Sequence, residues 1–290
     1  MSATETIQWN GAEALYVTDE RNNETPDLRE FLLSANTWAT GSIYSDIEER
    51  LVGQTWDDQE YNPSGNLNKL RFLSNAGSKL AIDHNRTFDS NGNVIKDAQI
   101  FNLTSGDASI KLSGTSKSTS SYASDDSGGA WSASGSLSYT DTNAFGTGQI
   151  LKASVKVESS GTWSWNDATN ESTSTYLGTT SVNASVAGYT LKTKTTDNYA
   201  DSAYWDSEAD GLIYTSSINQ GFGTYSFSDA NAGHAFSFSF NDSDDSVNEV
   251  LHFDMTNVKF SNADLSLTTK AVSIALSGED YQLWGDSVFG

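Results

Sequence analysis

Residues 221–241 read GFGTYSFSDANAGHAFSFSFN, and this stretch decides the fold class. Aromatic side chains stand at every second position in residues 225–227 and again in residues 236–240, with serines between them. In an extended chain such alternation sends the rings to one face and the hydroxyls to the other. Asp229–Gly233 lies between the two runs and supplies Asn and Gly, which tolerate a positive φ. The stretch therefore predicts a β-hairpin with one aromatic face and one hydroxyl face.

The same alternation runs through most of the chain. Residues 131–140 and 151–158 each alternate apolar side chains with Ser, Thr, Lys or Glu, and no proline follows Pro63. This pattern predicts an all-β protein. The predicted strands are too many for a single flat sheet, so we expect the apolar faces to meet in an elongated two-sheet β-sandwich or around an irregular β-solenoid.

The N-terminal segment, residues 1–63, has a different pattern. Thr25 and Pro26 resemble the first residues of a helix, and Ser45–Glu48 has the form of a capping box, with Gly53 as a stop signal. Two short helices are predicted here. Asp57–Glu60 is a run of four acidic or amide side chains, and Pro63, Ser64 and Gly65 follow, which predicts a loop or boundary here.

Residues 64–290 form the predicted β-rich domain. Within it, Ser116–Gly129 is rich in Ser, Asp and Gly and predicts a flexible loop. That loop divides the β-rich domain into two sub-parts of one continuous β structure, residues 64–128 and 129–290.

Composition excludes several classes of partner. The chain carries 38 acidic and 16 basic residues, a formal net charge of −22, so nucleic acid and anionic membrane surfaces would be repelled. There is no cysteine, which excludes disulfides and thiolate metal sites. The sequence contains no apolar run of about 20 residues, which is the length that a membrane-spanning helix requires. The first residues, MSATETIQWN, do not resemble a signal peptide.

Two acidic clusters are candidate calcium sites, because carboxylates at alternate positions can converge on one Ca²⁺ ion. The first is Asp206, Glu208 and Asp210 followed by Gly211, although Ser217 stands where a calcium loop places its bidentate Glu. The second is Asp242, Asp244, Asp245 and Glu249. The alternative interpretation of both clusters is a solvated acidic loop.

No catalytic set emerges from the sequence. His252 and Asp254 lie two apart on one predicted strand face, a pattern that suits a metal site or an acid/base pair but is commoner on ordinary surfaces. Trp131, Trp163 and Trp165 would suit sugar stacking, but their alternation places them in the predicted core. A glycosidase needs a pair of carboxylates, but with 38 acidic residues in the sequence such pairs are too easily formed for their abundance to identify a catalytic site. We therefore expect no enzyme activity.

Phe88–Ile100 resembles a hairpin module, roughly F-x-x-x-G-x-x-x-x-x-x-I, of bacterial extracellular proteins exported by type I secretion. The residues Leu32, Leu33, Trp38 and Ile43–Ser45 are similar to the start of serralysin-like proteins of that group. The resemblance implies an acidic, Cys-free protein without an N-terminal signal, with Asp286–Gly290 suited to an uncleaved C-terminal signal. The chain lacks the HExxH zinc motif and the glycine-rich calcium nonapeptides of the group, so neither protease activity nor a β-roll is implied.

These observations predict an extracellular or cell-surface structural protein that self-associates into a surface layer, matrix fibre or filament, with a possible calcium requirement. Strand addition at an open sheet edge, by the N-terminal segment or by Tyr281–Gly290, is one expected mode of assembly. A carbohydrate-binding adhesin module is the first alternative. A secreted polysaccharide-active enzyme and a phage or virion fibre are the others.

Overall fold

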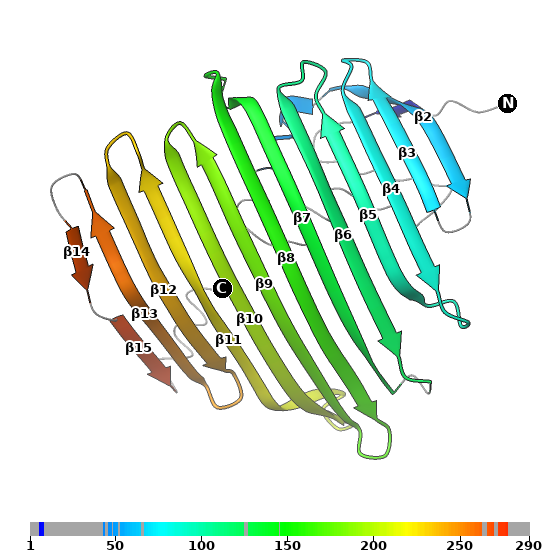
Figure 1. The fold of residues 1–290 in the computed structure, drawn as a ribbon. Coiled ribbons are helices and arrows are strands. Elements are labelled where there is room, and N and C mark those ends of the chain that lie inside the picture. The colour runs from blue at the N-terminus through cyan, green and yellow to red at the C-terminus, as the bar shows by residue number, and fades with distance from the viewer. Residues whose placement is uncertain are drawn as a thin grey trace. The chain divides into compact units, whose positions relative to one another are not determined.

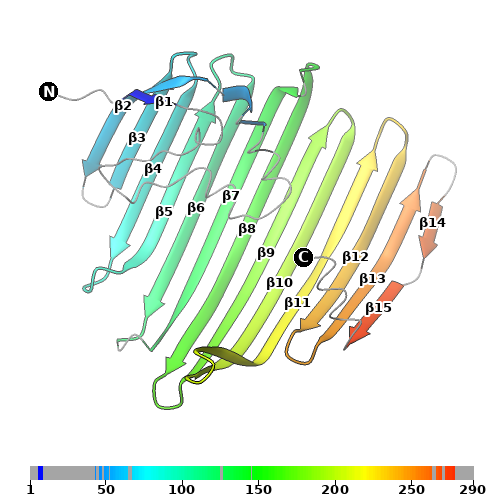
Figure 2. The same cartoon turned by 180° about the vertical axis from the view of Figure 1, so that it is seen from behind.

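The computed structural model of the chain describes residues 6–8, 43, 46–47, 49–51, 53–64, 67–124, 127–144, 146–262, 266–269 and 272–277. Most of these residues lie in β-strands, and the strands follow one another across a single sheet in chain order (Figures 1 and 2). The prediction of an all-β protein is confirmed.

Fifteen strands are present in the part of the chain that the structure describes. Their bounds are β1 Thr6–Gln8, β2 Thr55–Ser64, β3 Leu67–Ser74, β4 Lys79–Phe88, β5 Val94–Thr104, β6 Ile110–Tyr122, β7 Gly128–Ala144, β8 Gln149–Asn166, β9 Glu171–Val186, β10 Tyr189–Asp206, β11 Gly211–Asp229, β12 His234–Asp245, β13 Val250–Ser261, β14 Ser266–Thr269 and β15 Val272–Ser277.

Each strand from β1 to β14 is hydrogen-bonded to the next, and β15 joins β14 as a second partner of β13. The prediction of two packed sheets or of a solenoid coil is therefore wrong. It assumed that apolar strand faces must cover one another. Alternation shows which side chains share a face, but it does not show whether a sheet, a helix or solvent lies against that face.

The chain forms two compact units that share strands β6 to β9. Unit 1 comprises Met1–Thr119, Ala133–Val157 and Val182–Ala187, and unit 2 comprises Ser120–Ser132, Glu158–Ser181 and Gly188–Gly290.

The core of unit 1 forms where helical residues of the N-terminal segment pack on one face of the sheet. Ile43, Ile47 and Leu51 follow the i, i+4, i+8 spacing of one helix face and are almost fully buried. They belong to one cluster with strand residues of β3 to β9, which are Phe72, Leu80, Ile82, Phe101, Leu103, Ile110, Leu112, Leu137, Tyr139, Ala153, Val155 and Val182. A helix layer thus covers this face of unit 1.

The helix signals of the sequence are partly confirmed. Helical residues lie between 43 and 51, and Gly53 follows with a φ of 75°, the left-handed conformation that ends a helix. The helix predicted from Thr25 lies outside the described residues. None of the helical residues that the structure describes belongs to a helix long and apolar enough to cross a membrane.

Two predicted loops are strands instead. Residues 57–64 lie within β2, so strand structure begins inside the segment predicted to hold helices. Ser116–Tyr122 continues β6 and Gly128 already starts β7, so most of the predicted Ser116–Gly129 loop is strand. Hydroxyl side chains can bond across strands, as Thr115 Oγ1 and Ser136 Oγ do at 3.0 Å, so a serine-rich stretch need not be a loop.

Candidate functional site

The hairpin predicted from residues 221–241 is formed by β11 and β12. Phe227 lies opposite Phe236 and Tyr225 opposite Phe238, which places all four rings on one face because opposed residues of an antiparallel pair share a face. In the turn, Gly233 has a φ of 67°, and Asp229 Oδ1 accepts a hydrogen bond from the Asn231 N–H at 2.9 Å. The Asp side chain and the glycine backbone therefore fix the register of the hairpin.

The registers of β10 and β13 extend this face over four strands. We call it the aromatic face, and its rings include Tyr189, Tyr225, Phe227, Phe236, Phe238, Phe240, Phe253 and Phe260. Tyr225 stacks on Phe238 with ring centroids 5.0 Å apart, and Phe240 stacks on Phe253 at 6.5 Å. Tyr189 stacks on Phe227 at 6.1 Å. Such pairs stabilise a sheet beyond simple area burial.

Many of these rings remain in contact with solvent. The exposed fractions are 43% for Tyr189, 40% for Phe227 and 38% for Phe236 and Phe260. In unit 1 the corresponding apolar cluster is buried under helical residues. The aromatic face of unit 2 is therefore a half-exposed apolar surface, which in soluble proteins marks an interaction site.

Two glycines let bulky groups lie flat on this face. A Cβ at Gly223 would overlap the Phe240 ring and a backbone oxygen of β10, and a Cβ at Gly221 would overlap the carboxylate of Asp242. The side chains of β12 thus lean over β11 where the glycines leave space.

Carboxylates lie beside the rings on the same face. Asp197 of β10 and Asp242 of β12 flank Gly221, and Asp244 lies two residues beyond Asp242. Partial burial raises the pKa of Asp197. Partial burial, followed by the charges of Asp197 and Asp244, raises the pKa of Asp242. Sequence reasoning missed Asp197. Its position, an even six residues after Leu191, is the signal that could have placed a charge on the apolar face.

The opposite face of β10 to β13, which we call the hydroxyl face, carries rows of small polar side chains. One row runs Lys192, Ser226, Ser237, Lys259, and the next runs Lys194, Thr224, Ser239, Thr256. The division predicted from residues 221–241 into an aromatic and a hydroxyl face is confirmed. Phe222, 49% exposed, is a large apolar side chain within the hydroxyl face.

The first predicted calcium cluster lies in the turn between β10 and β11. Asp206 Oδ1 accepts hydrogen bonds from the backbone N–H groups of Glu208 at 2.8 Å and Ala209 at 3.3 Å. Asp210 adopts a positive φ of 49° before Gly211. The carboxylate of Asp206 thus holds the turn closed, a role that Asp performs without any ion.

The second predicted cluster does not converge. Asp242 and Asp244 lie on the aromatic face, whereas Asp245 lies on the hydroxyl face and accepts hydrogen bonds from Asn248 N at 3.0 Å and Nδ2 at 2.8 Å. Glu249 follows in the turn with a φ of 52°. In the described ranges, no three His, Cys, Asp or Glu side chains are grouped so that they could hold a metal ion.

The two clusters are also distant from each other. Both turns lie at the same end of the sheet, but the Ser246 N–H reaches β11 only at the Ser217 carbonyl. The six steps from there to Gly211 span roughly 20 Å at about 3.3 Å per residue. The structure therefore brings Asp242 and Asp244 together with Asp197, and not with Asp206, Glu208 or Asp210.

The histidines lie in ordinary strand positions. His252 and Asp254 share the hydroxyl face, opposite Ser243 and Asn241. His84 of unit 1 is buried, with Nε2 at 2.9 Å from Asp97 Oδ2 and 3.1 Å from Arg86 Nε. Burial alone would raise the pKa of Asp97, but hydrogen bonds and charges of His84 and Arg86 outweigh it and lower that pKa. We interpret this group as a structural ion cluster between β4 and β5.

The tryptophans predicted to lie in the core are only partly covered. Trp163 is 39% exposed. Trp131 is half-buried and lies 5.9 Å from Tyr176 between ring centroids, and Trp165 Nε1 donates to Asp167 Oδ1 at 2.6 Å. The alternation placed them correctly on strands, but this part of unit 2 leaves Trp163 in contact with solvent.

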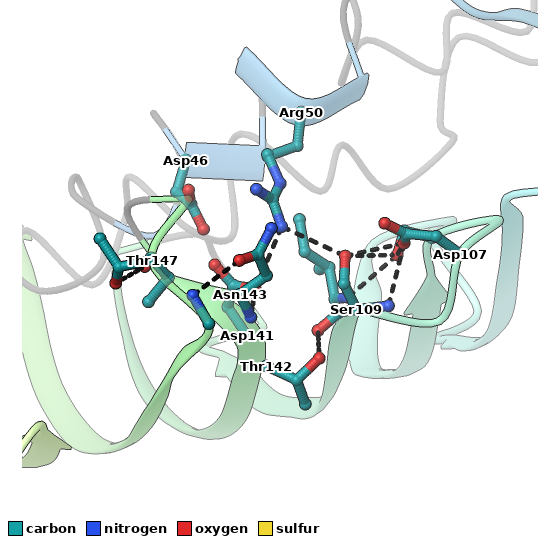
Figure 3. Close-up of polar contacts among 12 residues, drawn as sticks. Asp46, Arg50, Asp107, Ser109, Asp141, Thr142, Asn143 and Thr147 are labelled. Atoms are coloured by element: carbon teal, nitrogen blue, oxygen red, sulfur yellow. Dashed lines mark hydrogen bonds and ion pairs between the residues drawn. The ribbon is translucent and has the colours of Figure 1, made fainter.

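Unit 1 holds a dense polar cluster where the helical residues meet the sheet (Figure 3). Arg50 Nη2 donates to Asp141 Oδ1 and to Ser109 Oγ, both at 3.2 Å, and Asp141 is fully buried. Ser109 Oγ in turn donates to Asp107 Oδ1 at 2.7 Å. Hydroxyl and backbone donors from Ser105 and Ser109 lower the pKa of Asp107 to about 2. The cluster holds the helix on the sheet.

The Tyr139 hydroxyl donates to Asp46 at the same junction. Burial, followed by this hydrogen bond, raises the pKa of the tyrosine, which keeps its proton in place. The Tyr139 hydroxyl and Arg50 Nη2 thus both donate to partners within the fold.

Arg50→Met should lower the free energy of unfolding by about 3–5 kcal/mol, because it leaves the fully buried Asp141 without its cation. Denaturant unfolding at neutral pH measures the loss. Glu49→Ala, at an exposed helical position, serves as the control and should change the value by less than about 0.5 kcal/mol. The double variant Arg50→Met with Asp141→Leu should recover part of the loss. Equal effects of Arg50→Met and Glu49→Ala would contradict a tether at this site.

Asp242→Asn should stabilise the protein at neutral pH. The raised pKa means that the folded state disfavours the ionised carboxylate, so removing the charge removes a cost. The gain should shrink as pH falls through the raised pKa and vanish below the ordinary value of 3.8, where both forms are neutral. Asp245→Asn is the control with the opposite sign, because its hydrogen bonds with Asn248 lower the pKa of Asp245. Thermal unfolding from pH 3 to pH 7 measures both, and equal signs at pH 7 would refute this account.

We compared the chain with known protein families, curated proteins and solved structures. The chain matches no protein-family model, no curated protein and no solved structure at a significant level.

Proposed function

We propose that the chain is a non-enzymatic structural protein that self-associates as a subunit of an extracellular or cell-surface layer, matrix fibre or filament. One observation carries this proposal: the rings of the aromatic face are stacked in rows and yet remain 38–43% exposed at Tyr189, Phe227, Phe236 and Phe260. A regular apolar surface of this kind is costly to leave in water and is favourable to cover.

The edge of the sheet in unit 2 supports the same proposal. β14 and β15 both pair with β13, and among the described residues no strand pairs with their other sides. Unpaired backbone N–H and C=O groups at an edge are available to a strand of another chain. The acidic, Cys-free composition suits a protein that stays soluble outside the cell before it assembles.

Sedimentation velocity and electron microscopy over a concentration series test the proposal, with calcium and with chelator. We expect large assemblies to form as concentration rises. Phe236→Ser combined with Phe238→Ser should weaken association at least roughly tenfold, since burying one Phe contributes about 1.5–3 kcal/mol. Ile100→Ser, at a 50% exposed position of unit 1, is the matched control and should assemble normally. A monodisperse monomer at high concentration, with and without calcium, would refute the proposal.

Carbohydrate binding is a second candidate, favoured by exposed tryptophans in unit 2. Trp163 is 39% exposed and Trp205 is 42% exposed, and such rings can stack on sugars. Titration with acidic and neutral glycans should then change tryptophan fluorescence and protect it from quenching. Trp205→Ala should abolish most of the signal change if Trp205 stacks on the sugar, while Trp165→Ala, at the half-buried ring bonded to Asp167, should leave it intact. Identical fluorescence with and without every glycan would exclude this function.

A further inference from the structure

Charged side chains are divided between the two faces of β10 to β13. The structure describes three lysines in unit 2, Lys192, Lys194 and Lys259, and all three lie on the hydroxyl face. Each is exposed, and none forms an ion pair with a described residue. The arginines of the sequence lie outside unit 2. The positive charge of these strands is thus confined to one face.

The aromatic face has the opposite character. It carries Asp197, Asp242 and Asp244 beside the stacked rings, and no lysine or arginine of the described residues lies on it. Two carboxylates, Asp254 and Asp245, also lie on the hydroxyl face, one row and three rows beyond the row of Lys194.

This division decides which faces attract each other. Two aromatic faces would place carboxylates against carboxylates, in a chain whose net charge is already −22, and two hydroxyl faces would place lysines against lysines. An aromatic face against a hydroxyl face brings all three lysines of one copy to a surface that carries carboxylates and, among the described residues, no lysine or arginine. The exposed Phe222 of the hydroxyl face adds an apolar contact to that pairing.

The rows also match along the strands. Lys192 and Lys194 alternate on β10 with Leu191 and Thr193, which lie opposite Phe227 and Tyr225 on the aromatic face. In a stack that keeps the strands aligned, the lysines of one copy therefore lie over the aromatic rows of the next. Ammonium groups over aromatic rings are attracted to them, and the aliphatic stems of lysine cover apolar surface.

We propose that the aromatic face of β10 to β13 binds the hydroxyl face of the same strands in a second copy of the chain. This inference rests on the proposed function and specifies its interface. The two surfaces in contact are different, so every docked copy still presents one free surface of each kind (Figures 1 and 2 show the strands from both sides). Such head-to-tail contacts add copies without limit unless a ring closes. Sheets stacked in this way lie about 10 Å apart.

Two variants that each disable one face test the proposal. The aromatic-face variant is Phe236→Ser with Phe238→Ser, and the hydroxyl-face variant is Lys192→Glu with Lys194→Glu and Lys259→Glu. Alone, each variant should associate at least roughly tenfold more weakly than the wild type. The hydroxyl-face variant loses three cation–π contacts, and the aromatic-face variant loses two buried rings. Mixed, they should form a 1:1 heterodimer that grows no further, because each variant retains the face that the other has lost. Sedimentation velocity with one variant fluorescently labelled detects that species.

A charge-matched control separates the interface from net charge. Lys111→Glu with Lys117→Glu and Lys152→Glu changes three exposed lysines of unit 1 and should leave assembly unchanged. Carbodiimide cross-linking of unmodified protein, mixed from light and heavy isotopes, gives a second readout that needs no variant. It should join lysines of the hydroxyl face of one copy to carboxylates of the aromatic face of another, with Lys194 favoured because it is the lysine nearest along β10 to Asp197.

The outcomes distinguish the inference from the proposed function. A wild-type chain that never assembles overturns both. A hydroxyl-face variant that still dimerises, in a mixture without heterodimer, means that two aromatic faces pair and overturns the inference alone. Normal assembly of both variants, without the expected cross-links, places the contact at the sheet edge and also overturns the inference alone.

Discussion

The register between neighbouring strands is the constraint on which the rest of this structure depends. Opposed residues of an antiparallel pair share a face, and a slip of one residue would exchange the two faces of a strand. The Asp-rich turns resist such a slip, since the carboxylates of Asp206, Asp229 and Asp245 each accept hydrogen bonds from the backbone of their own turn. These acidic residues keep aromatic side chains in line with aromatic side chains across four strands.

The two units solve the same problem of an apolar sheet face in different ways. In unit 1 the helical residues Ile47 and Leu51 cover the face, and Arg50 neutralises the carboxylate that this cover buries. In unit 2 rings stack on one another and remain partly wet. Ring stacking stabilises neighbouring strands locally, yet it buries only the ring edges and faces that touch. The apolar sheet face of unit 2 therefore remains partly exposed, whereas the apolar sheet face of unit 1 is buried under helical residues.

The sequence predicted what depends on neighbours along the chain. The hairpin of residues 221–241, the two-residue alternation of β7 and β8 and the stop at Gly53 were all correct, because turn chemistry and side-chain parity are local properties. The layer arrangement was not predictable in the same way. Whether a second sheet, a helix or solvent lies against a strand face depends on residues far away in sequence, such as Leu51, which shares a buried cluster with residues of β4.

The same distinction explains the candidate site. The acidic clusters were visible as sequence neighbours, but Asp242 and Asp245 point to opposite faces, and Asp197 joins Asp242 only across β11. The alignment of Lys192 with Lys259 also needs three registers in succession, two of which contain a bulge. The alternation of side chains along each strand could have predicted which residues share a face. Which residues of neighbouring strands lie side by side on that face depends on the strand registers, which the sequence did not reveal.

The order of the strands has a consequence for how such a chain forms and changes. Each strand from β3 to β12 pairs with the strand before it and the strand after it, so the backbone ladders from β2 to β13 each close over a short loop. Short loops carry a small entropic cost and favour rapid pairing. Inserting or removing one pair of strands would leave the direction of every remaining strand unchanged. The side chains of the remaining strands would also stay on the same faces. The width of this sheet is therefore a property that can change in steps of one hairpin, while the chemistry of each face is preserved.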